Sequence, residues 1–460
     1  MYKVTSKLRI FAIALMILGA LFTAVGFWAV PSSQAEVQQM IDEDTAAHGG
    51  GHVETTDDQH GATDPSDENS YVASDTTDAH MDSHDNDHAE HLYHQLKNRP
   101  WSAVFVAAFF FFMIGLAALV FLALQKVAQA GWSPLLFRVM EGVGSYILPG
   151  GIIMFILLLL SGLHFNHLFI WMEEGVDIVG HENYDALVAG KTGYLNVPFW
   201  LFRAGAFIVG WNLYLWNIRR FGLKQDEAKS GDIVWYKKGF KHSAMFLVFF
   251  IVTESIMSWD WIMSVDPHWF STLFGWYVLS SMFVSGIATI ALVTIFLKSK
   301  GYLEFVNDSH IHDLAKFMFG FSIFWTYLWF SQFMLIWYSN IPEEVTYFVT
   351  RIEDYNLLFF GMVAINFLFP ILILMNSDFK RVNWFVVTAG IFILIGHYID
   401  IYVMIMPSTV GPSWFIGFPE IGALMFFAGL FIWYIFHTIS KVPLIPKGDP
   451  YLGESKHFHY

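Results

Sequence analysis

The sequence predicts an all-α integral membrane protein with about ten transmembrane helices. The chain of 460 residues is 55% hydrophobic and 18% aromatic, and only 14% of its residues are charged. Its apolar residues gather in ten stretches, each near the roughly 20 residues that a helix needs to cross about 30 Å of hydrocarbon. Lys and Arg are concentrated in every second connection between these stretches.

The expected spans follow one another with mostly short connections. Their approximate bounds are 9–30, 101–125, 139–163, 197–218, 242–264, 273–297, 314–338, 355–375, 384–406 and 414–438. The short connections leave no room for a soluble catalytic domain, so any chemistry is expected within the membrane or on partner subunits.

The distribution of basic residues predicts the orientation. One set of connections, together with both termini, holds 20 Lys and Arg, whereas the opposite set holds only Lys97, Arg99, Lys191 and Arg351. The positive-inside rule therefore places both termini in the cytoplasm, in agreement with an even number of spans. We expect a multi-pass membrane protein, and the family resemblance described below implies that its membrane is a bacterial inner membrane.

Residues 1–30 are expected to form an uncleaved transmembrane anchor. Lys3, Lys7 and Arg9 precede an apolar run from Ile10 to Val30, which is longer than the usual apolar core of a signal peptide.

The acidity of the chain belongs mostly to residues 31–100. This segment carries 16 Asp and Glu and 8 His, within a formal net charge of −15. It forms an outside loop with too few large apolar residues to fold alone, so we expect it to be disordered or held by a partner. The acidity of this segment does not indicate a nucleic-acid-binding surface. His80, His84, His88 and His91 would share one helical face, which leaves metal binding open beside a solvated polar loop.

The absence of Cys limits the chemistry of this chain. It excludes disulfides, thiolate metal sites, Cys-ligated iron–sulfur clusters and covalently attached haem. A b-type haem bound by two His stays open. His164 and His397 are expected at similar depths near the outer face, and His242 and His437 at similar depths near the inner face. We predict no metal site within the spans.

Ionisable residues inside the expected spans are the main candidates for function, because each costs about 2.5 to 3.5 kcal/mol at a helix centre unless it is paired or hydrated. Glu141, Glu254 and Asp260 would lie at inner, middle and outer depths, as a stepped set of carboxyls that can relay protons. His397 and Asp400 lie three residues apart, on one face of a helix. The other interpretation is that Arg203 pairs with Asp260 or Glu420 and only locks helices together.

Four segments resemble one known family. They read SWDWIMSVDPHWFSTLFGWYVLSS at 258–281, WYSNIPEE at 337–344, FPILILMNSDFKR at 369–381 and GHYIDIYVMIMP at 396–407. Together they are similar to the second quinol-oxidoreductase membrane subunit of alternative complex III, which belongs to the polysulfide-reductase, or NrfD-like, membrane-anchor family. The resemblance covers about residues 100–438.

This resemblance implies two four-helix bundles, at 101–265 and 266–408, followed by a last helix and cytoplasmic tail at 409–460. It implies a homologous membrane partner, an iron–sulfur subunit, multihaem cytochrome c subunits and surrounding lipids. The redox centres would lie on those partners, and the complex would oxidise menaquinol or ubiquinol and reduce cytochrome c. This chain would be a subunit without a redox centre of its own.

A quinol site within this chain is a further hypothesis. His164, Asp266 and His268 lie near the outer ends of their spans and offer hydrogen-bond and proton acceptors. Asp266 before Pro267 is equally an ordinary turn. Two rival functions also stay open. One is an ion-coupled secondary transporter, for which Pro149 with Gly150 and Gly151, and Pro370, are possible helix interruptions. The other is a purely structural membrane scaffold.

Overall fold

The described residues form helices that are joined by turns and loops. The structure is a computed structural model that describes residues 1–47, 77–229 and 231–459, and within these it omits the side chains of 42–47, 77–88 and 91. The chain divides into two compact units, one formed by Met1–Trp28 with Asn98–Tyr460 and the other by Ala29–Lys97. The described residues contain no strand, so the predicted all-α class is confirmed.

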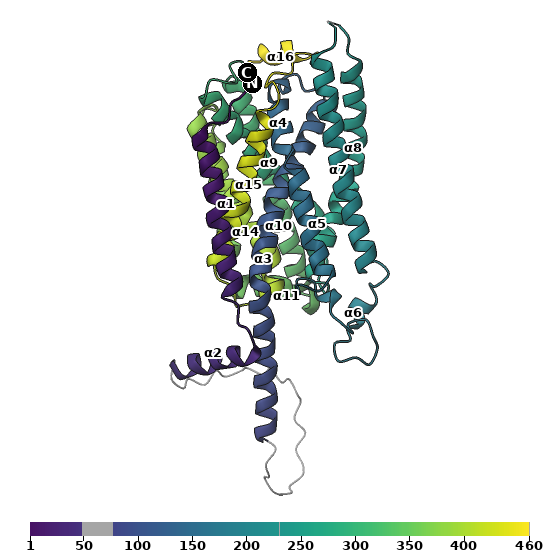
Figure 1. Cartoon of the computed structure of the whole chain (residues 1–460), viewed down its shortest axis with the longest axis vertical. Coiled ribbons are helices and arrows are strands. Elements are labelled where there is room, and N and C mark those ends of the chain that lie inside the picture. Colours follow the sequence, from purple (N-terminus) through teal and green to yellow (C-terminus); the bar gives the residue numbers. More distant parts are fainter. Residues whose placement is uncertain (48–76, 230, 460) are drawn as a thin grey trace, which may run out of the picture. The chain divides into compact units, whose positions relative to one another are not determined.

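The first unit is the membrane-spanning part of the molecule (Figure 1). In the described ranges, nine helical segments are long and apolar enough to cross a membrane. They are α1 (Ser6–Trp28), the Leu92–Val127 part of α3 (Thr77–Val127), α4 (Phe137–Gly144) with α5 (Ile147–Gly162), α8 (Val234–Trp261), α9 (Phe274–Ser299), α10 (Asp308–Ser339), α12 (Asn356–Val363) with α13 (Phe369–Leu374), α14 (Asn383–Val410) and α15 (Phe418–Ile439).

The one expected span left over, the fourth at 197–218, corresponds to α7 (Val197–Asp226), which is not among these nine. At 30 residues it is about 45 Å long, ample to cross a bilayer. Its polar residues, such as Arg203, lower its average hydropathy, but it packs along α8 and α5 and exposes Phe202, Val209 and Leu213 on its outer face. Its length, packing and apolar outer surface suit a membrane helix.

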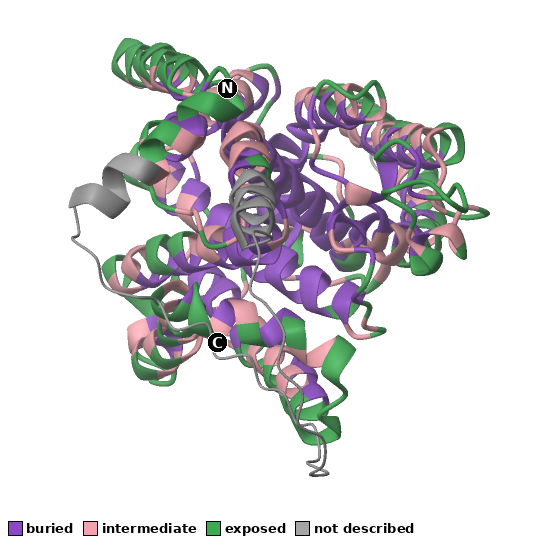
Figure 2. Ribbon diagram, turned by 90° about the horizontal axis from the view of Figure 1, so that it is seen from below, coloured by how far each residue is buried: buried purple, intermediate pink, exposed green. Residues whose placement is uncertain are grey.

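Two helices form the centre of the membrane unit. The apolar windows of α3 and α9 are each 94% buried, whereas those of the outer helices are much less so. Helices α5, α7 and α8 pack together on one side, and α9, α10, α13 and α14 pack together on the other. Figure 2 shows the buried residues at the middle of the bundle and exposed ones on its outer faces. The division into two four-helix bundles, at 101–265 and 266–408, stays a prediction, because all of these helices belong to one compact unit.

Two of the spans are interrupted, and each interruption lies close to a Pro. Helices α4 and α5 are separated at Ser145 and Tyr146, shortly before Pro149. Between α12 and α13 the chain forms a π-helical turn, η4 (Ala364–Leu368), shortly before Pro370. Pro has no N–H to offer to the carbonyl four residues earlier, so the α-helical ladder is broken there. The predicted interruptions are therefore present.

Helix α1 is held against α15 by small residues. Ala12, Gly19 and Gly26 are the buried residues of α1, spaced seven apart. A side chain at Gly19 would meet the backbone of Phe426 at 2.3 Å, and one at Gly422 would meet the backbone of Thr23 at 2.5 Å. Such close backbone contact is how membrane helices associate where water does not drive their packing. It ties the N-terminal helix to the last span.

The remaining elements are short. They are η1 (Pro134–Leu136), η2 (Ile170–Met172), α6 (Ala186–Ala189), η3 (Met263–Val265), α11 (Pro342–Glu353), η5 (Phe379–Arg381) and α16 (Leu452–Lys456). Both termini lie at one end of the membrane unit, here called the terminal end (Figure 1). Helices α6 and α11 lie at the other, here called the opposite end.

The second unit, Ala29–Lys97, contains α2 (Gln34–Ala47) and the first turns of α3. Because large apolar residues are few, this segment is expected to be disordered or held by a partner, whereas α2 and the start of α3 are helical. Glu36, in the first turn of α2, accepts hydrogen bonds from the N–H and hydroxyl of Ser32. These bonds lower the pKa of Glu36. The segment that contains His80, His84, His88 and His91 has a helical backbone. The side chains of these four residues lie outside the described part of the structure, so metal binding by them stays a hypothesis.

Candidate functional site

The second bundle contains a buried polar cluster, here called the α14 cluster, which comprises Tyr277, Ser281, Trp325, His397 and Asp400. His397 and Asp400 come from α14 and are fully buried. Oδ2 of Asp400 accepts hydrogen bonds from the Ser281 hydroxyl at 2.9 Å and from the Trp325 indole N–H at 2.8 Å. Its Oδ1 accepts one from the Tyr277 hydroxyl. The predicted proximity of His397 and Asp400 is confirmed by a contact of 3.3 Å.

The sequence spacing explains how the cluster forms. His397 and Asp400 are three residues apart on α14, and Tyr277 and Ser281 are four apart on α9, so each pair lies on one helical face. The two helices pack together, and Trp325 of α10 closes the third side, with its ring 5.3 Å from that of His397. Neutral donors from two neighbouring helices thus surround one carboxyl group, and the charged form of Asp400 needs no cation within the cluster.

The hydrogen bonds determine which nitrogen of His397 is open. The Ser281 hydroxyl donates its one proton to Asp400, and its oxygen lies 2.9 Å from Nδ1 of His397. Nδ1 must therefore donate, because Ser281 has no second proton. Nε2 is buried and has no hydrogen-bond partner among the described residues. Nε2 is therefore the nitrogen of this ring that is open to an ordered water molecule or a ligand.

Further unsatisfied polar atoms lie beside α14. Asn366, in the π-helical turn, is fully buried, and neither Oδ1 nor Nδ2 has a partner in the described part of the chain. A Cβ atom at Gly396, next to His397, would be 2.1 Å from Oδ1 of Asn366, so only Gly allows this approach. Nε2 of Gln332 is likewise unpartnered within the described ranges. Buried polar atoms of this kind are normally satisfied by ordered water or a ligand.

Glu254 is the candidate of the first bundle that stands without an ion pair. It lies on α8, and only 1% of its surface is exposed. No partner of its Oε1 is found among the described residues, and its Oε2 is 3.5 Å from the Ser255 hydroxyl, the limit of a hydrogen bond. A carboxyl group in this position persists only if it is protonated or meets water.

Asp260 is paired instead. Arg203 of α7 donates to both of its oxygens, from Nε at 2.6 Å and from Nη2 at 3.0 Å. The indole of Trp200 donates to the backbone carbonyl of Asp260 at 2.8 Å. This is the ion pair that the second interpretation predicted for Arg203. Glu420, the other partner considered there, is bound by Arg99 with bonds of 2.8 and 2.9 Å. Both pairs connect helices.

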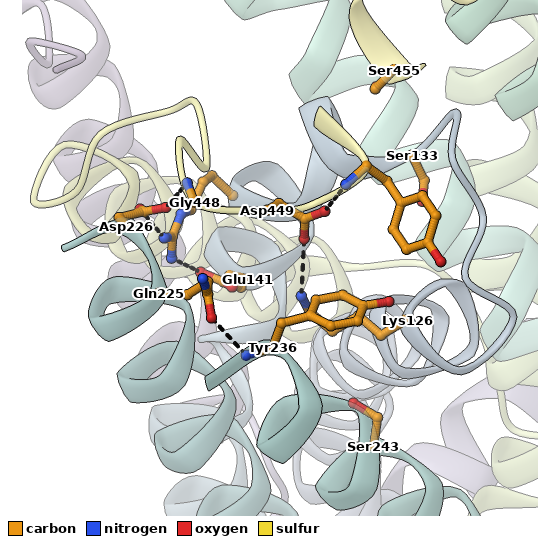
Figure 3. A network of polar contacts seen from close by, with 12 residues as sticks. Lys126, Ser133, Glu141, Gln225, Asp226, Tyr236, Ser243, Gly448, Asp449 and Ser455 are labelled. Atoms are coloured by element: carbon orange, nitrogen blue, oxygen red, sulfur yellow. Dashed lines mark hydrogen bonds and ion pairs between the residues drawn. The ribbon is translucent and has the colours of Figure 1, made fainter. Parts of the chain in front are cut away.

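Glu141 belongs to a network at the terminal end (Figure 3). Arg138 bridges Glu141 at 2.7 Å and Asp226 at 2.6 Å. Asp226 also accepts the backbone N–H of Gly448, and Lys126 lies 4.0 Å from Asp449. Burial raises the pKa of Asp449. A cavity of about 20 Å³ lies among these groups, about the space of one water molecule.

The residues of the hypothetical outer quinol site are only partly brought together. His268 is half exposed and forms a hydrogen bond with Asp185, while its Nδ1 is 3.9 Å from Asp266. That bond is the main cause that lowers the pKa of Asp185. His164 is exposed, in a left-handed turn with φ of 60°.

The two His of each suggested haem pair lie in different surroundings. The ring of His242 packs on Phe221 at 4.9 Å, and that of His437 stacks on Trp433 at 5.5 Å. His164 is exposed whereas His397 is buried in its cluster. The described residues contain no group of three or more His, Asp or Glu arranged to hold a metal ion.

Several residues of these sites were not singled out by sequence reasoning. Tyr277, Ser281 and Trp325 are aromatic or small residues, which are common in transmembrane helices. Only the packing of α9 and α10 against α14 brings them to Asp400. Tyr277 and Ser281 do fall within the segment 258–281 that resembles the known family, which was the one available signal. Neither a protein-family model nor a curated protein matches this chain.

Proposed function

We propose that this chain is an integral membrane subunit of a quinol-oxidising respiratory complex of the alternative complex III type, in which it provides part of a proton path. The observation that carries the proposal is the pair of buried proton-binding groups without partners among the described residues, Oε1 of Glu254 and Nε2 of His397. The resemblance of four segments to the NrfD-like family supplies the identity of the complex.

The proposed path uses both bundles. The network of Glu141, Asp226 and Asp449 is the proposed entrance at the terminal end, where a cavity of about 20 Å³ lies among charged side chains. Glu254 is the proposed mid-membrane carrier in the first bundle. His397, held by Ser281 and Asp400, is the proposed carrier in the second, with Asn366 and Gln332 as sites for connecting water.

In this proposal, a homologous NrfD-like subunit binds the quinol, and its oxidation alters the hydration or pairing of Glu254 and His397. Electrons pass to the iron–sulfur and multihaem cytochrome c subunits, since this chain has no Cys. The terminal end faces the cytoplasm of a bacterial inner membrane, as the distribution of Lys and Arg predicts. Asp260 and Glu420, which are ion-paired, act as structural links between helices.

The first test is purification of the tagged chain in a mild detergent, with mass spectrometry of its partners and a quinol-reduced-minus-oxidised optical spectrum. Multihaem cytochrome and iron–sulfur subunits should arrive with the chain. A colourless chain without such partners would refute membership of the complex.

The proton path is tested by Glu254→Gln, which keeps the side-chain volume and removes the proton-binding group. We expect fewer protons translocated per electron, with assembly intact, in the complex reconstituted into vesicles. Glu343→Gln, an exposed change on α11, is the matched control and should have no effect. An unchanged proton-to-electron ratio in Glu254→Gln would contradict a role for this residue.

An ion-coupled secondary transporter is the second candidate, favoured by the two interrupted spans, since broken helices near mid-membrane often form transport sites. The interruptions lie in the α4–α5 span and in the α12–α13 span, which do not occupy matching places in the two bundles. Ion-driven uptake by the purified chain alone in vesicles would favour the transporter over the respiratory subunit.

A further inference from the structure

The end of α7 and the start of α8 form a hairpin that is rich in Lys and Arg. It lies at the terminal end, at one edge of the membrane unit (Figure 1). The basic residues on its two helices, here called the basic hairpin, are Arg219, Arg220, Lys224, Lys237, Lys238 and Lys241. All of them are exposed or partly exposed, and none forms an ion pair with a carboxylate among the described residues. The proposed proton path does not use them.

One aromatic ring gathers basic groups from both helices. Nζ of Lys224 on α7 lies 4.2 Å from the ring centre of Trp235, and Nζ of Lys238 on α8 lies 4.3 Å from the same centre. Phe221 of α7 stacks on the Trp235 ring at 5.9 Å, which holds the indole between the two helices. A cation–π contact positions an ammonium group without neutralising its charge. Two like charges held close together repel each other, and an anion bound beside both relieves that repulsion.

The carboxylates between α7 and α8 do not neutralise this charge. Asp226 is bound by Arg138, which lies outside the hairpin, at 2.6 Å. Asp232 accepts the backbone N–H of Val234, the first residue of α8, at 3.0 Å. Glu227 is exposed. These three carboxylates are fewer than the basic residues around them, so the hairpin keeps a surplus of positive charge.

An apolar surface continues from the basic hairpin along both helices. Its exposed residues are Val209, Leu213 and Trp216 on α7, and Met245, Val248 and Val252 on α8. They are spaced three or four apart, so each set lies on one helical face. Arg220 extends the first set by four residues, with its guanidinium 5.1 Å from the Trp216 ring centre, and Lys241 extends the second. Each face therefore passes from apolar surface to positive charge within about one turn, as at the boundary between hydrocarbon and head groups.

We propose that the basic hairpin binds one anionic phospholipid, with its phosphate held by Lys224 and Lys238 beside Trp235 and its acyl chains against the exposed apolar residues of α7 and α8. Only a lipid offers an anion and hydrocarbon at the same boundary. A zwitterionic head group carries its own cation, so a head group with net negative charge is favoured next to several Lys and Arg. The inference goes beyond the proposed function and does not depend on it, because neither the proton path nor a partner subunit enters it.

The test uses native mass spectrometry to measure the lipid bound to the purified full chain with its native partners. Dioleoylphosphatidylglycerol is titrated in parallel with dioleoylphosphatidylcholine, which has the same tails and no net charge. We expect one site per chain that prefers phosphatidylglycerol. The double variant Lys224→Gln with Lys238→Gln should weaken this site about tenfold or more, because two charges near the head group are lost. Lys3→Gln with Lys7→Gln removes as much charge from exposed positions at the terminal end and should leave the site unchanged.

Two further arms separate the proposal from its alternatives. Lys224→Arg with Lys238→Arg keeps the charge and should retain the lipid, which distinguishes loss of charge from a distorted hairpin. Inorganic phosphate offers the anion without the hydrocarbon and should not displace the lipid at equal concentration. Equal binding of the two lipids, equal weakening by the two glutamine variants, or displacement by phosphate would each overturn the proposal. Loss of the lipid from the arginine variant would overturn recognition by charge.

Discussion

Asp400 shows how single residues make a buried carboxyl group tolerable in this bundle. The Trp325 indole can only donate, and it bonds to Oδ2 at 2.8 Å. Trp325→Phe keeps the ring and removes this donor, so one carboxylate oxygen loses a hydrogen bond to a charged group. We expect the free energy of unfolding to fall by about 1.5 to 3 kcal/mol, measured as a lower thermal midpoint in detergent.

The matched control for this change is Trp329→Phe, one turn further along α10. The indole nitrogen of Trp329 is buried but has no partner within the described residues. Its loss should therefore have a much smaller effect. Equal destabilisation by the two substitutions would show that lost ring packing, and not the bond to Asp400, matters at Trp325.

Asp185 provides a pH-dependent contact at the opposite end. It accepts the N–H groups of Leu187 and Val188 and bonds to His268, and the bond to His268 is the main cause of its lowered pKa. A lowered folded pKa means that this stabilisation is present above the ordinary Asp pKa of about 3.9. It is lost as the pH falls through the folded value.

We therefore expect the amides of Leu187 and Val188 to lose protection from hydrogen–deuterium exchange only below about pH 3.9. His268→Ala should move this loss to higher pH, because the pKa of Asp185 returns toward its ordinary value. Asp185→Asn keeps a capping side chain that does not titrate. A pH step that persists in Asp185→Asn would assign the effect to another group.

At the scale of elements, the packing of α1 on α15 depends on the size of a few side chains. Gly19→Leu places a large side chain where the backbone of Phe426 lies 2.3 Å from a Cβ position. Membrane helices in such contact cannot shift apart without losing the interface. We expect destabilisation by about 1 to 3 kcal/mol or more, seen as a lower thermal midpoint.

Ala20→Leu adds the same side chain one residue later, on the exposed face of α1. It should leave the thermal midpoint nearly unchanged. If the two variants behave alike, the close approach of α1 to α15 is not a source of stability.

The elements that sequence reasoning found are those with a local signal. Apolar length identified the spans, and the missing N–H of Pro149 and Pro370 predicted where two of them break. Helix α2 lacks such a signal, because it has few large apolar residues. The pairing of His397 with Asp400 follows from spacing within one helix. Their bonds to Ser281, Tyr277 and Trp325 depend on packing between helices, and so does the choice of Arg203 between two carboxylates.

For the whole molecule, the C-terminal tail joins distant parts at the terminal end. The N–H of Gly448 donates to Asp226 at the end of α7, and Ser455 donates to the carbonyl of Trp132 after α3. The amide of Asn307, which caps α10, donates to the carbonyl of Phe458. The tail thus connects α7, the segment after α3 and the start of α10 through bonds that each join a backbone group to a side chain.

Gly448 lies where the space around this tail is limited. A Cβ there would lie 2.0 Å from the carbonyl oxygen of Gln225, whereas nothing lies within 4 Å of a Cβ at Gly453 in α16. Gly448→Ala should therefore displace the tail, and Gly453→Ala should not. The expected readout is faster trypsin cleavage after Lys447 in Gly448→Ala alone.

The same assay tests the proposed orientation. If the terminal end faces the cytoplasm, trypsin should reach Lys447 of Gly448→Ala in inside-out vesicles and not in right-side-out vesicles. Cleavage in right-side-out vesicles would reverse the orientation inferred from Lys and Arg. Equal cleavage of Gly448→Ala and Gly453→Ala in inside-out vesicles would instead show that the tail is not held by its contact with α7, because only Gly448 lies against that helix.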